Sequence, residues 1–230
     1  MLENLKNQVL YANQALEKYG LVTFTWGNVS GFDPESRLMA IKPSGVPYQD
    51  LQTEDIVLVD LSGQAVEGSL KPSSDTPTHI ELYKTFSEIR GIVHTHSDWG
   101  TAWAQAGQSI PCAGTTQADY FYGEIPCTRQ LTKNEVEEAY EKNTGTVIIE
   151  AFKDRNPLEV PGVIVRGHAP FAWGTSPENA VHNAVVLEKT AKMTYLSRQL
   201  LSDPATENLE EYILNKHYER KHGKNAYYGQ

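Results

Sequence analysis

Two histidines, His94 and His96, are the first residues of this sequence whose type and spacing suggest chemistry. They follow Gly91-Ile-Val, an apolar run that predicts a short buried strand. Because side chains alternate along a strand, both imidazoles are expected on one face. Neutral imidazoles side by side can bind one transition-metal ion at about 2.0–2.1 Å. A hydrogen-bonded structural pair is an equally ordinary arrangement, so a metal site needs ligands from elsewhere in the chain.

Two further residues could supply those ligands. The run Gly162-Val-Ile-Val-Arg-Gly-His168 repeats the pattern of a glycine, an apolar strand and a terminal histidine. It could bring a third imidazole to the same edge of a sheet, which strengthens the metal interpretation. Asp75 stands immediately before a predicted helix. Its carboxylate could bind the same ion, although a capping aspartate is the default interpretation of that position.

The sequence Lys-Pro-Ser occurs twice, at residues 42–44 and 71–73. Each loop offers a lysine, hydroxyl groups and backbone N–H groups, so the two together could wrap one oxyanion. Thr76 is predicted to be the N-cap of a helix with proline at its first position. Ser73 and Ser74 would then lie at a helix N-terminus, where an anion such as phosphate is favoured. The alternative is that these serines merely turn the chain.

Two other polar residues, each with an ordinary structural alternative, are candidates for contacts with a ligand or for catalysis. Gly27-Asn28 interrupts the strand-like run of residues 21–31, so Asn28 is either a ligand contact or a turn asparagine. Asp119, in the polar loop 114–120, is either an acid/base group or an ordinary loop aspartate.

The length and composition limit the classes of protein to consider. The chain has 230 residues, enough for one α/β domain, and its 20 basic and 29 acidic residues give a net charge of −9. Without a basic stripe, nucleic acid is not an expected partner. The sequence shows no leader and no long apolar run, so we expect no membrane partner. We expect a cytoplasmic location instead. Helices are predicted over 3–19, 132–143, 146–153, 176–200 and 209–222. Cys112 and Cys127 are expected to be reduced and not catalytic.

Several motifs together give a more specific picture. TWGNVSG, IKPSGV, KPSSDTPTH, GIVHTH, GTTQADYFYG, GHAPFAWG, VHNAVVLE and KHYERKHGKNAYYGQ occur in this order. In these motifs the chain resembles the class II (zinc-dependent) aldolase family, and within it the L-ribulose-5-phosphate 4-epimerases. The resemblance implies a single domain over 1–230 with a three-layer α/β/α fold around a mixed, largely antiparallel sheet. It also implies a homotetramer in which the C-terminal tail, about residues 223–230, reaches a neighbouring subunit.

The resemblance also implies roles for particular residues. One Zn²⁺ per subunit, replaceable by Mn²⁺ or Co²⁺, would be bound by Asp75, His94, His96 and His168. Asp119 and Tyr228 would be the acid/base pair, with the tyrosine coming from a neighbouring subunit. Arg166-Gly167 departs from the His-Ser pair that relatives carry before the third histidine. The substrate and its phosphate would contact Gly27, Asn28, Lys42, Ser44, Gly45, Ser73 and Ser74, and, across the interface, Thr115, His217 and Arg220.

The activity implied is the interconversion of the sugar phosphates L-ribulose 5-phosphate and D-xylulose 5-phosphate, by cleavage and re-formation of the C3–C4 bond. An aldolase acting on a related sugar phosphate is the main alternative, and those enzymes carry glutamate at the position of Asp75. A non-catalytic domain, as in the adducins, is disfavoured because all four ligands are retained. A purely structural zinc is disfavoured because such sites favour cysteine-rich sets.

Overall fold

The computed structural model describes residues 2–200 and 208–228. Within this part of the chain, seven strands form one sheet in the order β4-β3-β2-β1-β5-β7-β6. Every pair of neighbouring strands is antiparallel, and an isolated parallel bridge joins Cys127 to Ile164. The predicted largely antiparallel sheet is therefore confirmed. The strands are β1 (Asn28–Asp33), β2 (Leu38–Ile41), β3 (Val57–Asp60), β4 (Ala65–Glu67), β5 (Gly91–His94), β6 (Gly162–Ile164) and β7 (Pro170–Gly174).

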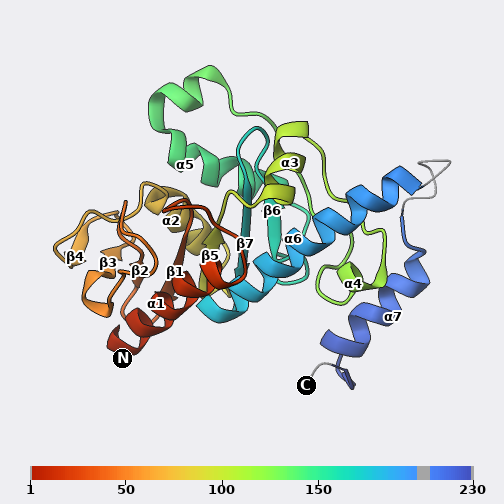
Figure 1. Cartoon of the computed structure of the whole chain (residues 1–230), viewed down its shortest axis with the longest axis horizontal. Helices are drawn as coiled ribbons and strands as arrows, with labels where there is room; N and C mark the ends of the chain where they lie inside the picture. Colours follow the sequence, from red (N-terminus) through yellow and green to blue (C-terminus); the bar gives the residue numbers. More distant parts are fainter. Residues whose placement is uncertain (1, 201–207, 229–230) are drawn as a thin grey trace.

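Helices cover both faces of the sheet, as the predicted three-layer architecture requires. Figure 1 shows α1 and α6 crossing one face, while α2 and α5 lie on the other side. The short α4 and the C-terminal α7 stand at the side of the molecule away from β1–β4. The helices are α1 (Leu2–Lys18), the 3-10 turn η1 (Thr53–Asp55), α2 (Thr76–Thr85), α3 (Asp98–Ala106), α4 (Thr115–Ala118), α5 (Lys133–Ala151), α6 (Pro177–Leu200) and α7 (Glu211–His222).

Alternation along the strands divides the core between the two faces. In β2, Met39 and Ile41 belong to the cluster that contains the α2 side chains, whereas Ala40 packs with the α1 side chains. In β5, Ile92 belongs to the first cluster and Val93 packs with residues of α1 and α6. Because side chains two apart in a strand share a face, His94 lies on the same side as Ile92, above the larger core.

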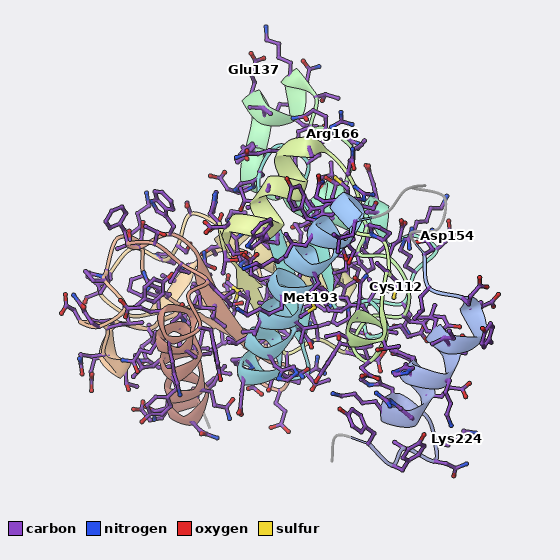
Figure 2. The ribbon with its side chains drawn as sticks, turned by 45° about the vertical axis from the view of Figure 1, so that its right-hand side comes forward. Cys112, Glu137, Asp154, Arg166, Met193 and Lys224 are labelled. Carbon is purple, nitrogen blue, oxygen red and sulfur yellow. The ribbon has the colours of Figure 1, made fainter. Side chains whose placement is uncertain are left out.

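The structure corrects three local predictions. The strand expected over 21–31 begins only at Asn28, and the preceding residues form a loop. The helix α2 begins one residue earlier than predicted, so Asp75 rather than Thr76 is its N-cap residue. Two helices were expected over 132–143 and 146–153, and α5 does consist of two helical segments, but the break between them lies at the non-helical Ala139 and not at residues 144–145. Figure 2 shows Glu137, just before this bend, at the outer tip of the helix.

None of the helices described is both long and apolar enough to cross a lipid bilayer.

Candidate active site

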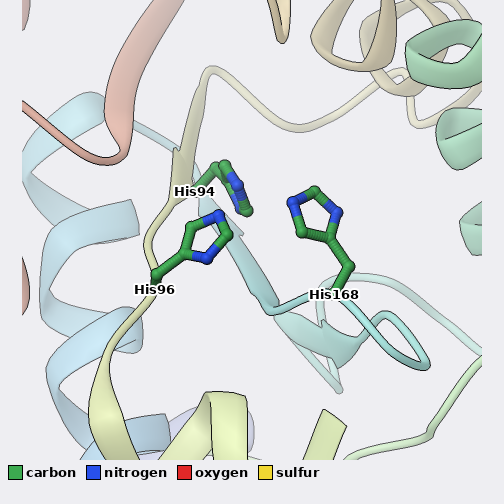
Figure 3. A group of neighbouring side chains, drawn as sticks. All are labelled: His94, His96 and His168. Atoms are coloured by element: carbon green, nitrogen blue, oxygen red, sulfur yellow. The ribbon is translucent and has the colours of Figure 1, made fainter. Parts of the chain in front are cut away.

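Three imidazoles converge at one end of the sheet. One ring nitrogen from each of His94, His96 and His168 lies within 4.8 Å of the others, and the ring centroids are 4.8–5.0 Å apart. His94 ends β5, while His96 lies just beyond that strand and His168 precedes β7. Figure 3 shows the three rings turned toward a common centre. This arrangement suits three nitrogen ligands of a single ion.

Neighbours in the sheet fix the orientation of His94. Its Nδ1 lies 3.1 Å from the carbonyl oxygen of Pro170, and since a carbonyl can only accept, Nδ1 must carry the proton. Its ring stacks on Phe171 of the adjacent strand, with centroids 4.1 Å apart and planes 16° apart. The lone pair of Nε2 is then free for a metal ion. A histidine that binds a metal usually donates its other ring N–H to a carbonyl or carboxylate in this way.

A tight turn presents His168. The backbone N–H of His168 donates to Val165, and Val165 in turn donates to Ala169. Gly167 has φ +72°, a left-handed conformation that other residues adopt at a cost. The unexpected pair Arg166-Gly167 therefore forms the turn itself. The predicted strand ending at His168 is wrong in detail, because β6 stops at Ile164.

The charge state of the imidazoles suits metal binding. Burial lowers the pKa of His96, and the nearby His94 lowers it further. Burial, followed by His94 and His96, lowers the pKa of His168 to about 3. Both rings are then neutral at pH 7, as ligands must be. The Nδ1 of His168 is buried with no hydrogen-bond partner among the described residues. The residues present therefore fit a divalent transition metal.

Asp75 lies in the same cavity, although its carboxylate is not one of the donors grouped within 4.8 Å. Its side chain does not cap α2. Instead, its Oδ2 accepts hydrogen bonds from Asn28 Nδ2 at 2.7 Å and Ser73 Oγ at 3.4 Å. Burial raises the pKa of Asp75, but the opposing effects of His94, His79 and the Asn28 hydrogen bond outweigh it, so the net pKa is lowered. The carboxylate is ionised beside the three rings.

The cavity in front of these groups has a volume of about 610 Å³ and opens to solvent. It brings together all the residues predicted for the metal and for the phosphate within one subunit. Five further lining residues were not predicted. The predicted set is Gly27, Asn28, Lys42, Ser44, Gly45, Ser73, Ser74, Asp75, His94, His96 and His168, and the additional ones are Thr25, Trp26, Pro43, Tyr140 and Glu141.

The two Lys-Pro-Ser loops lie side by side along the cavity. Ser44 N–H donates to the carbonyl of Lys71 at 2.9 Å, and Ser73 N–H donates to the carbonyl of Lys42 at 3.1 Å. Lys42 is only 1% exposed, and its Nζ lies 4.9 Å from the centre of the Tyr48 ring. No carboxylate of the described residues is within ion-pair distance of it. Burial lowers the pKa of Lys42 to about 8, so the group is mostly cationic at pH 7 and suited to an anionic ligand.

Tyr140 and Glu141 enter the cavity because α5 bends. Ala139 has φ −165° and ψ 75°, which redirects the helix immediately before them. The carbonyl of Glu141 accepts a hydrogen bond from Thr78 of α2 at 2.5 Å. The Tyr140 ring lies 5.9 Å from that of His168. No local sequence signal marks this bend, so neither residue could have been placed from the sequence.

The remaining predicted site residues lie elsewhere in the same chain. We call Asp119, His217, Arg220 and Tyr228 the distal cluster, since none of them lines the histidine cavity. Arg220 donates to Asp119 through Nε and Nη2, at 3.0 and 2.8 Å, and His217 Nδ1 lies 3.1 Å from the same carboxylate. The Arg220 guanidinium lies 4.1 Å from the centre of the Tyr228 ring. Thr115, at the start of α4, lines another cavity, against α6.

The charge of Asp119 follows from these contacts. Burial raises its pKa, but the hydrogen bonds from Arg220 and His217 outweigh that effect, so the net pKa is lowered. The carboxylate is therefore ionised at neutral pH and can accept a proton.

Two glycines of the cavity allow a test of how tightly it is built. Gly27 and Gly45 both have positive φ, +85° and +74°. A Cβ on Gly27 would lie 2.5 Å from the carbonyl oxygen of His94, whereas one on Gly45 would meet nothing within 4 Å. Gly45→Ala is expected to cost about 1 kcal/mol of unfolding free energy through backbone strain. Gly27→Ala is expected to cost about 3 kcal/mol, because the clash adds to the strain.

Urea unfolding of both variants measures this difference, with Gly45→Ala as the control for strain. Equal losses of stability would show that the backbone at Gly27 can move away from His94.

Comparison with known proteins places this geometry among related structures. Residues 7–195 match the sequence model of the family described as the Class II Aldolase and Adducin N-terminal domain. A solved L-fuculose 1-phosphate aldolase is 26% identical, with 94% of this chain and 95% of that chain covered and a TM-score of 0.79. The L-fuculose-1-phosphate aldolase of Thermus thermophilus is 25% identical, with 85% and 95% covered and a TM-score of 0.66. That of Glaciozyma antarctica is 17% identical, with 95% and 81% covered and a TM-score of 0.76, and so shares the fold.

Proposed function

Because the chain belongs to the class II aldolase family, we propose that it is a metal-dependent L-ribulose-5-phosphate 4-epimerase, which forms D-xylulose 5-phosphate. The observation that carries the proposal is one cavity in which three imidazoles and Asp75 stand beside the buried cation of Lys42. A metal site next to an anion site is what a phosphorylated sugar with a carbonyl group requires. The order of the sequence motifs supports the epimerase within that class.

The metal would be held by His94, His96 and His168, with Asp75 as the fourth ligand, and Zn²⁺ suits this donor set, although Mn²⁺ and Co²⁺ could replace it. When bound, such an ion supplies a Lewis acid that polarises the carbonyl of the sugar. Asn28 holds the Asp75 carboxylate through its Nδ2. Its own Oδ1 is buried without a partner among the described residues, so it can accept a hydrogen bond from a substrate hydroxyl.

The paired Lys-Pro-Ser loops would bind the phosphate. Lys42 supplies the positive charge, and its burial strengthens the attraction to a dianion because the surroundings have a low dielectric constant. Ser44, Ser73 and Ser74 line the same wall and supply hydroxyl donors. The loops thus fix the phosphate end of the sugar while the rest of the molecule reacts.

Replacing Lys42 with methionine separates two effects of this lysine: the free energy of unfolding that its buried charge costs, and the affinity that it gives for the phosphate. The pKa of Lys42 is lowered to about 8, so between pH 8 and its unfolded value of about 10.5 the unfolded chain binds more protons. The free energy of unfolding of the wild-type protein therefore rises with pH in that window. At pH 7 the variant is expected to be more stable by about 1–3 kcal/mol. It should bind L-ribulose 5-phosphate at least about tenfold more weakly.

Urea unfolding at pH 7 and pH 9.5, together with calorimetric titration, measures both effects. Lys71→Met is the matched control, since Lys71 is exposed in the paired loop, and it should leave stability nearly unchanged. If Lys42→Met lost stability and kept its affinity, Lys42 would be a structural residue and not a phosphate ligand.

The reaction must break a carbon–carbon bond, because the proton on C4 is not acidic when the carbonyl is at C2. A base removes the proton of the C4 hydroxyl, the C4–O bond becomes a carbonyl, and the electron pair of the C3–C4 bond passes to C3, next to the C2 carbonyl. Glycolaldehyde phosphate is formed, turns its other face, and the steps reverse. The C4 oxygen lies on opposite sides before and after the aldehyde turns. A second proton-transfer group is therefore needed on the second side. No oxidant or further reactant is needed.

We propose that the distal cluster of a neighbouring copy supplies both proton-transfer groups in a homo-oligomer, expected to be a tetramer. Asp119 would act as one group and the Tyr228 hydroxyl as the other, beside His217, Arg220 and Thr115. The tail that carries Tyr228, about residues 223–230, would reach the neighbour's cavity. Its last two residues, 229 and 230, lie outside the described residues.

The second candidate is an aldolase that releases the aldehyde of a related sugar phosphate. The similarity to an L-fuculose 1-phosphate aldolase, 26% identical over nearly the whole chain, favours it. Such an enzyme would use the same cavity for the metal and the phosphate. Its products would differ, because the aldehyde would leave and would not be added back.

The experiment that separates them follows both products at once. The zinc-loaded protein is incubated with L-ribulose 5-phosphate, and D-xylulose 5-phosphate and free glycolaldehyde phosphate are measured. Xylulose phosphate with little free aldehyde supports the epimerase. Accumulating aldehyde would favour the aldolase, and no turnover by fully zinc-loaded protein would overturn the proposed substrate.

A further inference from the structure

A strained loop with two exposed aromatic side chains stands at the edge of the histidine cavity. Phe24 is 80% exposed and Trp26 is 52% exposed, and their rings form an edge-to-face pair with centroids 5.8 Å apart. Phe24 has φ +54°, in the left-handed region that bulky residues rarely adopt. Strain of this kind is kept mainly at functional sites, and here no burial of the aromatic rings offsets it.

The backbone below Trp26 is firmly held. The hydroxyl of the buried Tyr48 lies 2.7 Å from the carbonyl oxygen of Trp26 and 2.8 Å from that of Gly27, within donating distance of both. The N–H of Trp26 donates to Thr23 at 3.1 Å. The backbone of Trp26 is therefore held in place, and the Phe24 ring packs edge-to-face with its indole.

The indole lies at the edge of the cavity nearest His96. Trp26 is one of its lining residues, and its ring lies 6.4 Å from that of His96. It is followed in the chain by Gly27 and Asn28, which line the same cavity. The indole therefore lies beside both the proposed metal group and the residues proposed to contact the sugar.

We propose that Trp26 is a specificity-determining residue, whose indole retains the aldehyde fragment in the cavity between bond cleavage and re-addition. This inference rests on the proposed function. An aromatic face packs against C–H groups without directional hydrogen bonds, so it can confine a small aldehyde while allowing it to turn. It also excludes water from that side of the cavity. A fragment held in this way re-adds and does not escape.

The partition between the two products tests the proposal. Trp26→Ala, Trp26→Phe and Phe24→Ala are compared with the wild-type protein for D-xylulose 5-phosphate and free glycolaldehyde phosphate formed from L-ribulose 5-phosphate. Trp26→Ala is expected to raise the fraction of turnovers that release aldehyde about tenfold or more. Trp26→Phe should restore most of the retention, and Phe24→Ala should raise release about two- to threefold. An unchanged partition in Trp26→Ala would overturn the proposal.

A second readout does not depend on turnover. Of the four tryptophans, Trp26 is the most exposed, since Trp103 and Trp173 are buried and Trp99 is partly buried. In the His96→Ala background, L-ribulose 5-phosphate is expected to change the tryptophan fluorescence, and Trp26→Phe should abolish that change. The proposed function fails if zinc-loaded wild-type protein does not turn over the sugar. The present inference fails if the fluorescence of Trp26 responds only to protein concentration, because a second copy would then cover the indole.

Discussion

Replacing His96 with alanine is expected to remove most of the bound zinc and to lower turnover of L-ribulose 5-phosphate by about a thousandfold or more. The substitution takes away one of the three imidazoles whose nitrogens lie within 4.8 Å of one another. The two that remain, with Asp75, form an incomplete set for a tetrahedral ion. Because His96 is less buried than His94, its loss should leave the fold intact. Zinc per chain measured by mass spectrometry, together with the product assay, checks both effects.

His182→Ala is the matched control, since this histidine lies on α6 and lines a different cavity. It should keep one zinc per chain. Circular dichroism of both variants separates loss of the ion from loss of the fold. A His96→Ala protein that still bound one zinc per chain and turned over the sugar would show that the three imidazoles are not the metal site.

The three-histidine cluster could be predicted because local pattern and position in the sheet agree. A glycine and an apolar run precede both His94 and His168, and antiparallel pairing brings β5 next to β7. The details differed from the simple picture of two histidines on one strand. His96 lies beyond the end of β5 and His168 lies in a turn. His94 and His96 do lie together, with ring centroids 5.0 Å apart, but alternation along a strand cannot be the full reason, because only His94 belongs to the strand.

The two Lys-Pro-Ser loops were predictable for a different reason. Their repeated residue types suggested one shared anion, and the structure pairs them through backbone hydrogen bonds. The burial of Lys42 was not predictable, because it depends on Tyr48 and on the packing of the opposite loop. A lysine in a loop is usually exposed, and only the tertiary structure removes this one from water.

Residues placed by bends and strain could not be predicted from the sequence. Tyr140 and Glu141 reach the cavity because Ala139 interrupts α5, in a stretch with no proline or glycine next to it. Trp26 was expected to belong to a strand, and its role became visible only with the left-handed backbone of Phe24. These are positions where tertiary contacts override local propensity.

The position of the distal cluster leads to a prediction about mixed oligomers. In one chain, Asp119 is bound by Arg220 and His217 and does not line the histidine cavity. If each active site takes its histidines from one copy and Asp119 from a neighbour, two inactive variants can repair each other. His96→Ala and Asp119→Asn should each be nearly inactive. Refolded together in equal amounts, they should recover about a quarter of the wild-type activity, the share of sites that receive both intact halves.

A second mixture distinguishes this arrangement from a site within one chain. Wild-type protein refolded with an equal amount of the double variant His96→Ala/Asp119→Asn should show about a quarter of the activity of the same total amount of wild-type protein if the halves come from different copies, but about half of it if both come from one chain. Size-exclusion chromatography must first show an oligomer that re-forms after mixing. No recovery in the first mixture, with half the activity in the second, would mean that Asp119 acts in its own chain, which would require Asp119, at the end of α4, to move toward the histidine cavity.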